Sequence, residues 1–334
     1  MTMETSDPPS ERPVSDASLE YQSTPLLEQL RREGFPGLRK LDLTTYFGRH
    51  LNEVDAEDIL RHSRDIDVLI GEFVGTNPRM RSLIRDALAG KILPETVPRF
   101  KDDQCFKTLS NGLRNTPTRI AFADVPAESD EGKEFIRTHM RLESFTKDAV
   151  KFKYTRAAAR EELKKRTVDF ARTIPARERY IVAHIGPAII EAYPNPAQRE
   201  NISHLKVLMQ LGKHHAHLFE AVQRLHPPAT KQEQEYRTSA MPYATLIFKT
   251  IDNELIPESL SDDTLIEVLV GSLISGGLSR TYKKPSEHDT YMLKVINEMN
   301  DEERQAFCTA YTRRGTVQTK QYLENYLREK GLMR

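Results

Sequence analysis

Four apolar segments of the chain each lead into a polar side chain that enzymes use for chemistry. Residues 39–47 precede His50, residues 66–71 precede Glu72, residues 118–123 precede Asp124, and residues 179–183 precede His184. Imidazole and carboxylate groups transfer protons near neutral pH, bind divalent metal ions, and anchor substrates. We therefore take His50, Glu72, Asp124 and His184 as candidate site residues, with His50 and Glu72 as an acid–base or metal-binding pair.

Each candidate also has a structural interpretation. Glu72 follows Gly71 and precedes Phe73, and it could instead be a solvated carboxylate or the cap of the next helix. His50 could be a surface histidine, although Gly48 allows a tight turn just before it. Asp124 could form a turn ahead of Val125-Pro126. The sequence alone leaves both interpretations open.

The segments that precede these residues are short and apolar, and residues 66–71 are also rich in β-branched residues, which predicts four strands with helical segments between them. Alternating strands and helices are typical of a parallel sheet built from βαβ units. The carboxyl ends of such strands meet in a crevice where ligands bind. We predict an α/β fold with a mainly parallel sheet and flanking helices.

The organisation along the chain predicts three parts. Residues 1–24 are polar and rich in proline, and we expect a disordered leader. Residues 25–195 form the predicted α/β domain, and the charged segment 129–172 forms a helical insertion that projects as a cap. Residues 196–334 are predicted to be all-helical, and Asn300 with Glu303 has the spacing of a capping box.

Two charged clusters have mainly structural interpretations. Histidines 204, 214, 215, 217 and 226 lack the spacing of a metal-binding helix, and a helix would place His214 and His217 on a solvated face. The run 156–166 is predicted to be a helix with i,i+4 ion pairs. Its last residue, Arg166, is our candidate for an electrostatic clamp on substrate.

The composition excludes some classes of protein. The 334 residues contain 49 Lys and Arg and 49 Asp and Glu, so no net charge favours a nucleic-acid partner. The chain has no apolar run long enough for a membrane span. Cys105 and Cys308 are two cysteines in helix-like segments, which we expect to be buried free thiols in a cytoplasmic protein. The oligomeric state is left open.

The order of these segments resembles the TraB-like group, a superfamily that includes ChaN-like haem-binding lipoproteins, erythromycin-esterase-like enzymes and Tiki proteases. The resemblance covers about residues 38–190. Three pieces follow the family's order: a strand running into Gly48-Arg49-His50, a strand that ends in Glu72, and an apolar segment before Asp124. Two further pieces approximate family motifs. Arg166-Thr167 stands in place of an Arg-Asn motif, and residues 180–189 stand in place of a strand that enters a second G-x-x-H motif.

The resemblance implies a hydrolase, with an optional divalent metal held by His50, Glu72 and His184, acting on a small-molecule or peptide substrate. It places Glu72, His50, Arg166 and Asp124 in the catalytic site. Two residues depart from the pattern: Phe47 replaces the first motif glycine and Ile189 replaces the second motif histidine. These departures motivate an alternative, a catalytically degenerate binding or scaffold protein that acts through its helical C-terminal half.

Overall fold

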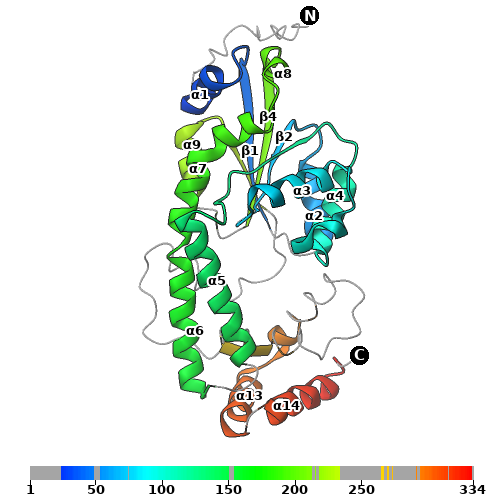
Figure 1. The fold of residues 1–334 in the computed structure, drawn as a ribbon. Coiled ribbons are helices and arrows are strands. Elements are labelled where there is room, and N and C mark those ends of the chain that lie inside the picture. The colour runs from blue at the N-terminus through cyan, green and yellow to red at the C-terminus, as the bar shows by residue number, and fades with distance from the viewer. Residues whose placement is uncertain are drawn as a thin grey trace, which may run out of the picture.

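The protein contains a five-stranded, all-parallel sheet with helices on both faces (Figure 1). The computed structural model describes residues 24–48, 53–73, 75–149, 154–212, 215, 218–233, 265–266, 269–270, 273, 291, 294–314 and 316–332. The strand order is β3-β2-β4-β1-β5. The strands are β1 (Lys40–Gly48), β2 (Val68–Ile70), β3 (Arg119–Ala121), β4 (His204–Gly212) and β5 (Thr230–Glu233). The predicted α/β fold with a parallel sheet is confirmed.

Successive residues of the strands point to opposite faces of the sheet, and each face has its own core. On one face, Val68 and Ile70 of β2 pack in a core with α1 (Pro25–Glu33), α7 (Ile174–Glu191) and α9 (Leu218–Leu225). On the other face, Leu69 packs in a core with α2 (Glu53–His62), α3 (Pro78–Leu88) and α4 (Gln104–Leu113). The three helices on each face bury both sides of the sheet, as parallel sheets require.

Side-chain caps fix the starts of several helices at the positions that the sequence suggests. The Asn77 side chain accepts a hydrogen bond from the backbone N–H of Met80, and Pro78 occupies the first turn of α3. Asn300 and Glu303 form the predicted capping box at the start of α13 (Asp301–Arg314), with both reciprocal hydrogen bonds at 2.9 Å.

A third core lies away from the sheet. It combines α5 (Asp130–Ala149) and α6 (Arg156–Ala171) with α13, α14 (Thr316–Glu329) and apolar side chains of residues 265–299. Figure 1 shows α5 and α6 running from the carboxyl edge of the sheet toward α13 and α14. The predicted insertion therefore projects from the sheet, and the C-terminal helices pack on it. The remaining short elements are η1 (Pro94–Thr96), η2 (Pro98–Phe100) and α8 (Ala197–Glu200).

The predicted strand at residues 179–183 is wrong, because this segment lies in the middle of α7. The apolar residues Ile174, Ile181, Ile185 and Ile189 are all buried on one side of an 18-residue helix. A helical period sustained over that length outweighs the β-branched character of five residues. Gly186 lies against Gln29 of α1, so this glycine allows two helices to pack closely rather than forming a loop.

The prediction that only helices follow residue 196 is also wrong, because β4 and β5 belong to the sheet. β4 is inserted between β2 and β1, and its residues from Val207 to Gly212 are all buried. Its leucine, methionine, glutamine and lysine residues favour a helix in isolation. Burial between two strands and two helical layers overrides that preference.

Parts of other predictions fall outside the described residues, namely the predicted leader up to residue 23, most of residues 234–293 in the predicted all-helical region, and residues 214 and 217 of the histidine-rich stretch. Thr24 belongs to the fold rather than to the leader. It is buried and its hydroxyl caps α1. Across the part of the chain that is described, no helix is both long and apolar enough to cross a membrane.

Candidate functional site

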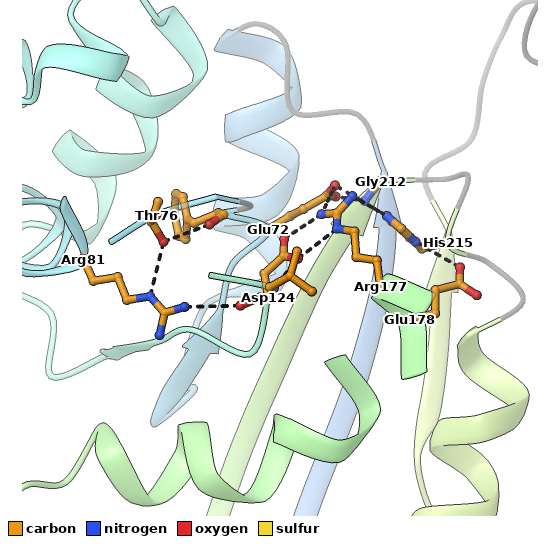
Figure 2. A network of polar contacts seen from close by, with 10 residues as sticks. Glu72, Thr76, Arg81, Asp124, Arg177, Glu178, Gly212 and His215 are labelled. Carbon is orange, nitrogen blue, oxygen red and sulfur yellow. Dashed lines mark hydrogen bonds and ion pairs between the residues drawn. The ribbon is translucent and has the colours of Figure 1, made fainter. Parts of the chain in front are cut away.

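Three neighbouring strands deliver polar side chains to one place at the carboxyl edge of the sheet (Figure 2). Glu72 follows β2, Asp124 follows β3, and His215 follows β4. Because β3, β2 and β4 are adjacent and parallel, their carboxyl ends lie at the same edge. The first turn of α7, which packs against β2 and β3, adds Arg177 and Glu178.

Arg177 is the centre of this network. Its Nε and Nη2 donate to the two carboxylate oxygens of Asp124 at 2.8 and 2.6 Å. Nη2 also donates to Oε1 of Glu72 at 2.7 Å, and Nη1 donates to Nε2 of His215 at 2.9 Å. The ring of Phe135 from α5 lies 4.6 Å from the guanidinium carbon. All three guanidinium nitrogens are thus engaged in a side chain that is only 1% exposed.

The electrostatics keep this arginine charged. Burial by itself lowers the pKa of Arg177, but the charges and hydrogen bonds of Asp124 and Glu72 raise it above its usual value. A buried guanidinium is tolerated when carboxylates match its planar donors in this way. The cation therefore holds the ends of β2 and β3 together at the edge of the sheet.

Backbone groups orient the two carboxylates. The N–H of Val125 donates to Oδ1 of Asp124 at 2.8 Å, and the N–H of Gly212 donates to Oε2 of Glu72. Arg81 of α3 donates to the carbonyl oxygen of Asp124 at 3.3 Å and so supports the same loop. Glu72 is linked to β4 as well as to α7, and its side chain is 7% exposed.

His215 joins the network through both ring nitrogens and is fully buried. Because Arg177 can only donate, Nε2 accepts and the ring hydrogen lies on Nδ1, where it donates to Oε1 of Glu178 at 2.9 Å. Nε2 also lies 3.6 Å from Oε1 of Glu72. A proton added at Nε2 would therefore replace the hydrogen bond from Arg177 with an ion pair to Glu72.

Opposing effects act on the pKa of His215. Burial and the positive charge of Arg177 lower it, whereas Glu178 and Glu72 raise it, and the net result is a raised pKa. Three carboxylates of the network, from Glu72, Asp124 and Glu178, lie around the guanidinium of Arg177 and the imidazole, whereas the guanidinium of Arg81 donates to Thr76 and to the backbone of Asp124. The excess of negative charge explains why the carboxylates prevail at the imidazole.

The connections of the sheet place this network at a topological switch point. The chain leaves β2 toward α3 on one face, and it leaves β4 toward α9 on the other face. Adjacent parallel strands whose connections diverge in this way open a crevice at their carboxyl ends. Glu72 and His215 follow these two strands, so the network occupies the position where open α/β sheets bind ligands.

The structure brings some of the predicted residues together and separates others. Glu72 and Asp124 meet at Arg177, as their places at strand ends predict. His50 lies outside the described residues; β1 ends at Gly48, which pairs with Gly212. His184 lies about two helical turns beyond Arg177 on α7, and its Nδ1 contacts the carbonyl oxygen of Tyr180 at 2.7 Å.

Arg166 is not the arginine that contacts Glu72 and Asp124. It lies on α6, where its Nε donates to Glu162 at 2.6 Å and its Nη1 donates to the carbonyl oxygen of Arg141. Ile189, the expected position of the second motif histidine, is a core residue of α7. Its lack of a functional group therefore says nothing about the site.

Sequence reasoning missed Arg177, Glu178 and His215. A signal for His215 was present, because Gly212-Lys213-His214-His215 has the G-x-x-H spacing and directly follows an apolar run. Interpreting residues 204–217 as a solvated helix concealed it. No local pattern distinguishes Arg177 from the other arginines of this charged region, because its partners are 53 and 105 residues away in the sequence.

The donor set that is described does not fit a metal ion. Within the described residues, no group of three His, Cys, Asp or Glu side chains is arranged to hold one. Glu72 and Asp124 converge on the guanidinium of Arg177, which occupies the position that a cation would take. The predicted set of His50, Glu72 and His184 gains no support, since His184 is held by its own helix.

No family model, curated protein or solved structure matches this chain. The candidate site is therefore defined by its geometry alone. Its defining features are a buried arginine shared by two carboxylates, and a buried histidine held between that arginine and a third carboxylate.

Proposed function

We propose that the chain is a TraB-like hydrolase, with His215 as its acid–base group and Arg177 as its electrostatic clamp. The observation that carries this proposal is the pair of contacts at His215. Glu178 holds Nδ1 at 2.9 Å, which leaves Nε2 as the basic nitrogen, and Nε2 faces the guanidinium of Arg177 at 2.9 Å. A carboxylate-oriented imidazole beside a fixed positive charge suits hydrolysis of an ester or amide.

The proposed reaction uses these groups in order. The carbonyl oxygen of the substrate accepts the hydrogen bond of Arg177 Nη1, which frees Nε2 of His215. Nε2 takes a proton from water as the water oxygen attacks the carbonyl carbon, and Arg177 stabilises the negative charge on the tetrahedral intermediate. The protonated imidazole then gives its proton to the leaving alcohol or amine as the carbon–heteroatom bond breaks.

The position of His215 strengthens the TraB-like proposal. On this proposal, the second G-x-x-H motif is Gly212–His215 instead of residues 186–189, and β4 is the strand that leads into it. The isoleucine at position 189 no longer argues against activity. We retain His50 as the first motif histidine, because it follows Gly48, and Gly48 pairs with Gly212.

One observation favours the alternative, a catalytically inactive binding or scaffold protein. Both carboxylate oxygens of Glu72 accept hydrogen bonds from the protein, and the Arg177, Glu72 and Asp124 side chains are at most 7% exposed. On this alternative the network is a structural tie, meaning that it only stabilises the fold by linking β2, β3 and β4 to α7. The helical region formed by α5, α6, α13 and α14 would then carry the partner surface.

Activity of matched histidine variants distinguishes the two proposals. Purified protein is tested on chromogenic esters and on peptide amides, together with His215→Gln and His204→Gln. His204 is the control, since it lies on the same strand with an exposed side chain paired to Asp42. The hydrolase proposal predicts that His215→Gln lowers the rate by about 10²–10⁴-fold while His204→Gln leaves it unchanged.

Three outcomes decide against the hydrolase. These are no turnover of any ester or amide, equal activity of both variants, and activity that survives Glu178→Gln, His215→Gln and Glu72→Gln alike. The substrate class that we propose is a small ester or a peptide. We also propose a reducing compartment such as the cytoplasm, since Cys105 and Cys308 are buried free thiols.

A further inference from the structure

The outward-facing surface of α5 carries two parallel stripes of side chains. Lys133, Arg137 and Arg141 are exposed and spaced four residues apart, so they form one cationic line. Ile136 and Met140 form an apolar line beside it. Met140 is 61% exposed, the largest exposed fraction among the three exposed large hydrophobic residues in the described part of the chain.

These two stripes line a groove of about 590 Å³, and Arg166 of α6 forms its far wall. Arg166 is held in place by Glu162 and by the carbonyl oxygen of Arg141. The α5–α6 groove is therefore lined by four cations and by apolar atoms. No carboxylate lies in the lining within the described part of the chain.

Two carboxylates near the groove, those of Asp130 and Glu134, are weakly engaged, whereas Glu162 is paired with Arg166. Asp130 is fully exposed and lies 3.7 Å from Lys133, and the Arg137–Glu134 pair is a solvent-exposed i,i+3 contact. Exposed pairs of this kind contribute little to stability, so an incoming anion can replace them at low cost. The cationic stripe is thus available for a partner.

The fold itself does not require the outer face of α5. The inner face supplies Phe135 to Arg177, and it supplies Leu142 and Phe145 to the third core. The side chains of Lys133, Arg137, Met140 and Arg141 contribute to neither, whereas Arg166 lies over the ring of Phe145. An exposed apolar stripe beside a cationic one costs solubility, and such a combination marks interaction surfaces.

We propose that the α5–α6 groove binds an acidic amphipathic helix of a partner protein. The spacing of the groove supports a helix as the ligand. Cations four residues apart lie about 6 Å apart along α5, which is the spacing of glutamates at i, i+4 and i+8 of a second helix. A line of leucines beside those glutamates would then cover Ile136 and Met140, in the manner of helix-in-groove recognition.

A binding experiment tests this proposal without any need for catalytic activity. The probe is a fluorescein-labelled helical peptide of 14 residues with glutamates at i, i+4 and i+8 and leucines beside them. Its binding to the full-length protein is followed by fluorescence anisotropy at low and high salt. Comparison peptides carry lysine in place of glutamate, or serine in place of leucine.

Charge reversal in the groove supplies the decisive variants. We expect Arg141→Glu to weaken binding of the acidic peptide by about tenfold, because one attraction is lost and one repulsion is added. Met140→Ser is expected to weaken it as well. Lys101→Glu is the control, since it also reverses an exposed positive charge, but one outside the groove, and is expected to leave binding unchanged. Circular dichroism confirms that each variant is folded.

Several results would overturn the proposal. The first is an acidic peptide that does not bind, and the second is binding that Arg141→Glu and Lys101→Glu affect equally. A third is binding of the lysine peptide at least as tight as that of the acidic one. Vesicles of anionic lipid that bind through Arg141 while the peptide does not would reassign the groove to a lipid surface.

Discussion

The guanidinium of Arg177 forms a bidentate ion pair with Asp124, in which Nε and Nη2 each donate to a different carboxylate oxygen. Asp124 follows β3, whereas Arg177 lies in the first turn of α7, 53 residues later. Because the remaining edge of the same guanidinium reaches Glu72 and His215, this contact links the ends of three strands to one helix.

Replacement of Arg177 by methionine is expected to destabilise the protein strongly. It leaves Glu72 and Asp124 buried without their counter-charge, which typically costs about 3–5 kcal/mol in free energy of unfolding. Urea unfolding measures the loss. Arg137→Met is the control, because that arginine pairs with Glu134 on the exposed face of α5, and little change is expected. Equal stability of the two variants would show that the Arg177 network is not a structural tie.

The stability of the protein should depend on the protonation of His215. Its folded-state pKa is raised, so the folded state binds the proton more tightly than the unfolded chain does. The resulting stabilisation is fully present below the unfolded value of 6.5 and is lost as the pH rises through the folded value. The melting-temperature difference between the protein and His215→Gln should therefore shrink with rising pH. A difference that grows with pH would contradict the assignment.

His226 is expected to show the opposite pH dependence. It is buried, it contacts the Thr24 hydroxyl and the Leu41 carbonyl, and burial lowers its pKa from 6.5 despite that carbonyl and Asp42. Its stabilising contribution is therefore present above 6.5 and is lost as the pH falls toward the folded-state pKa. Between acidic and neutral pH, the melting temperature of His226→Gln should therefore fall less with decreasing pH than that of the unaltered protein. Side-chain NMR titration of the two histidines gives an independent check on both directions.

Gly75 is expected to tolerate no side chain. It has a φ of 66°, and an added Cβ would lie 2.8 Å from Cδ1 of Ile136. Gly75→Ala combines backbone strain of about 1–2 kcal/mol with a close contact that the Ile136 side chain must relieve by moving. Gly331→Ala is a matched control, since its φ is 65° and its added Cβ meets nothing within 4 Å. Thermal unfolding should show a larger loss for Gly75→Ala, and equal losses would exclude the contact with Ile136.

Part of the candidate site could be predicted from the sequence. Glu72 and Asp124 each follow a short apolar segment, and parallel strands of a sheet bring such positions to one edge. The two residues do meet there, through Arg177. The local signals sufficed because both strands are marked by short apolar runs, and because the polar side chains follow closely after their ends.

Local sequence patterns did not identify the histidine and the arginine of the site. His215 follows β4, whose residues favour a helix in isolation and become a strand only between β2 and β1. Arg177 lies two residues before the segment predicted to be a strand, and it reaches the site because α7 packs against β2 and β3.

By itself, the sequence determined the class of fold, the first three strands, the helix caps and the two carboxylates at strand ends, because each depends on residues close together in the chain. Only the tertiary structure decided which cation and which imidazole join those carboxylates. The insertion of β4 into the sheet and the docking of α7 depend on burying apolar surface between segments that are distant in the sequence. Such burial is non-directional, so no local sequence pattern identifies which distant segments will pack together.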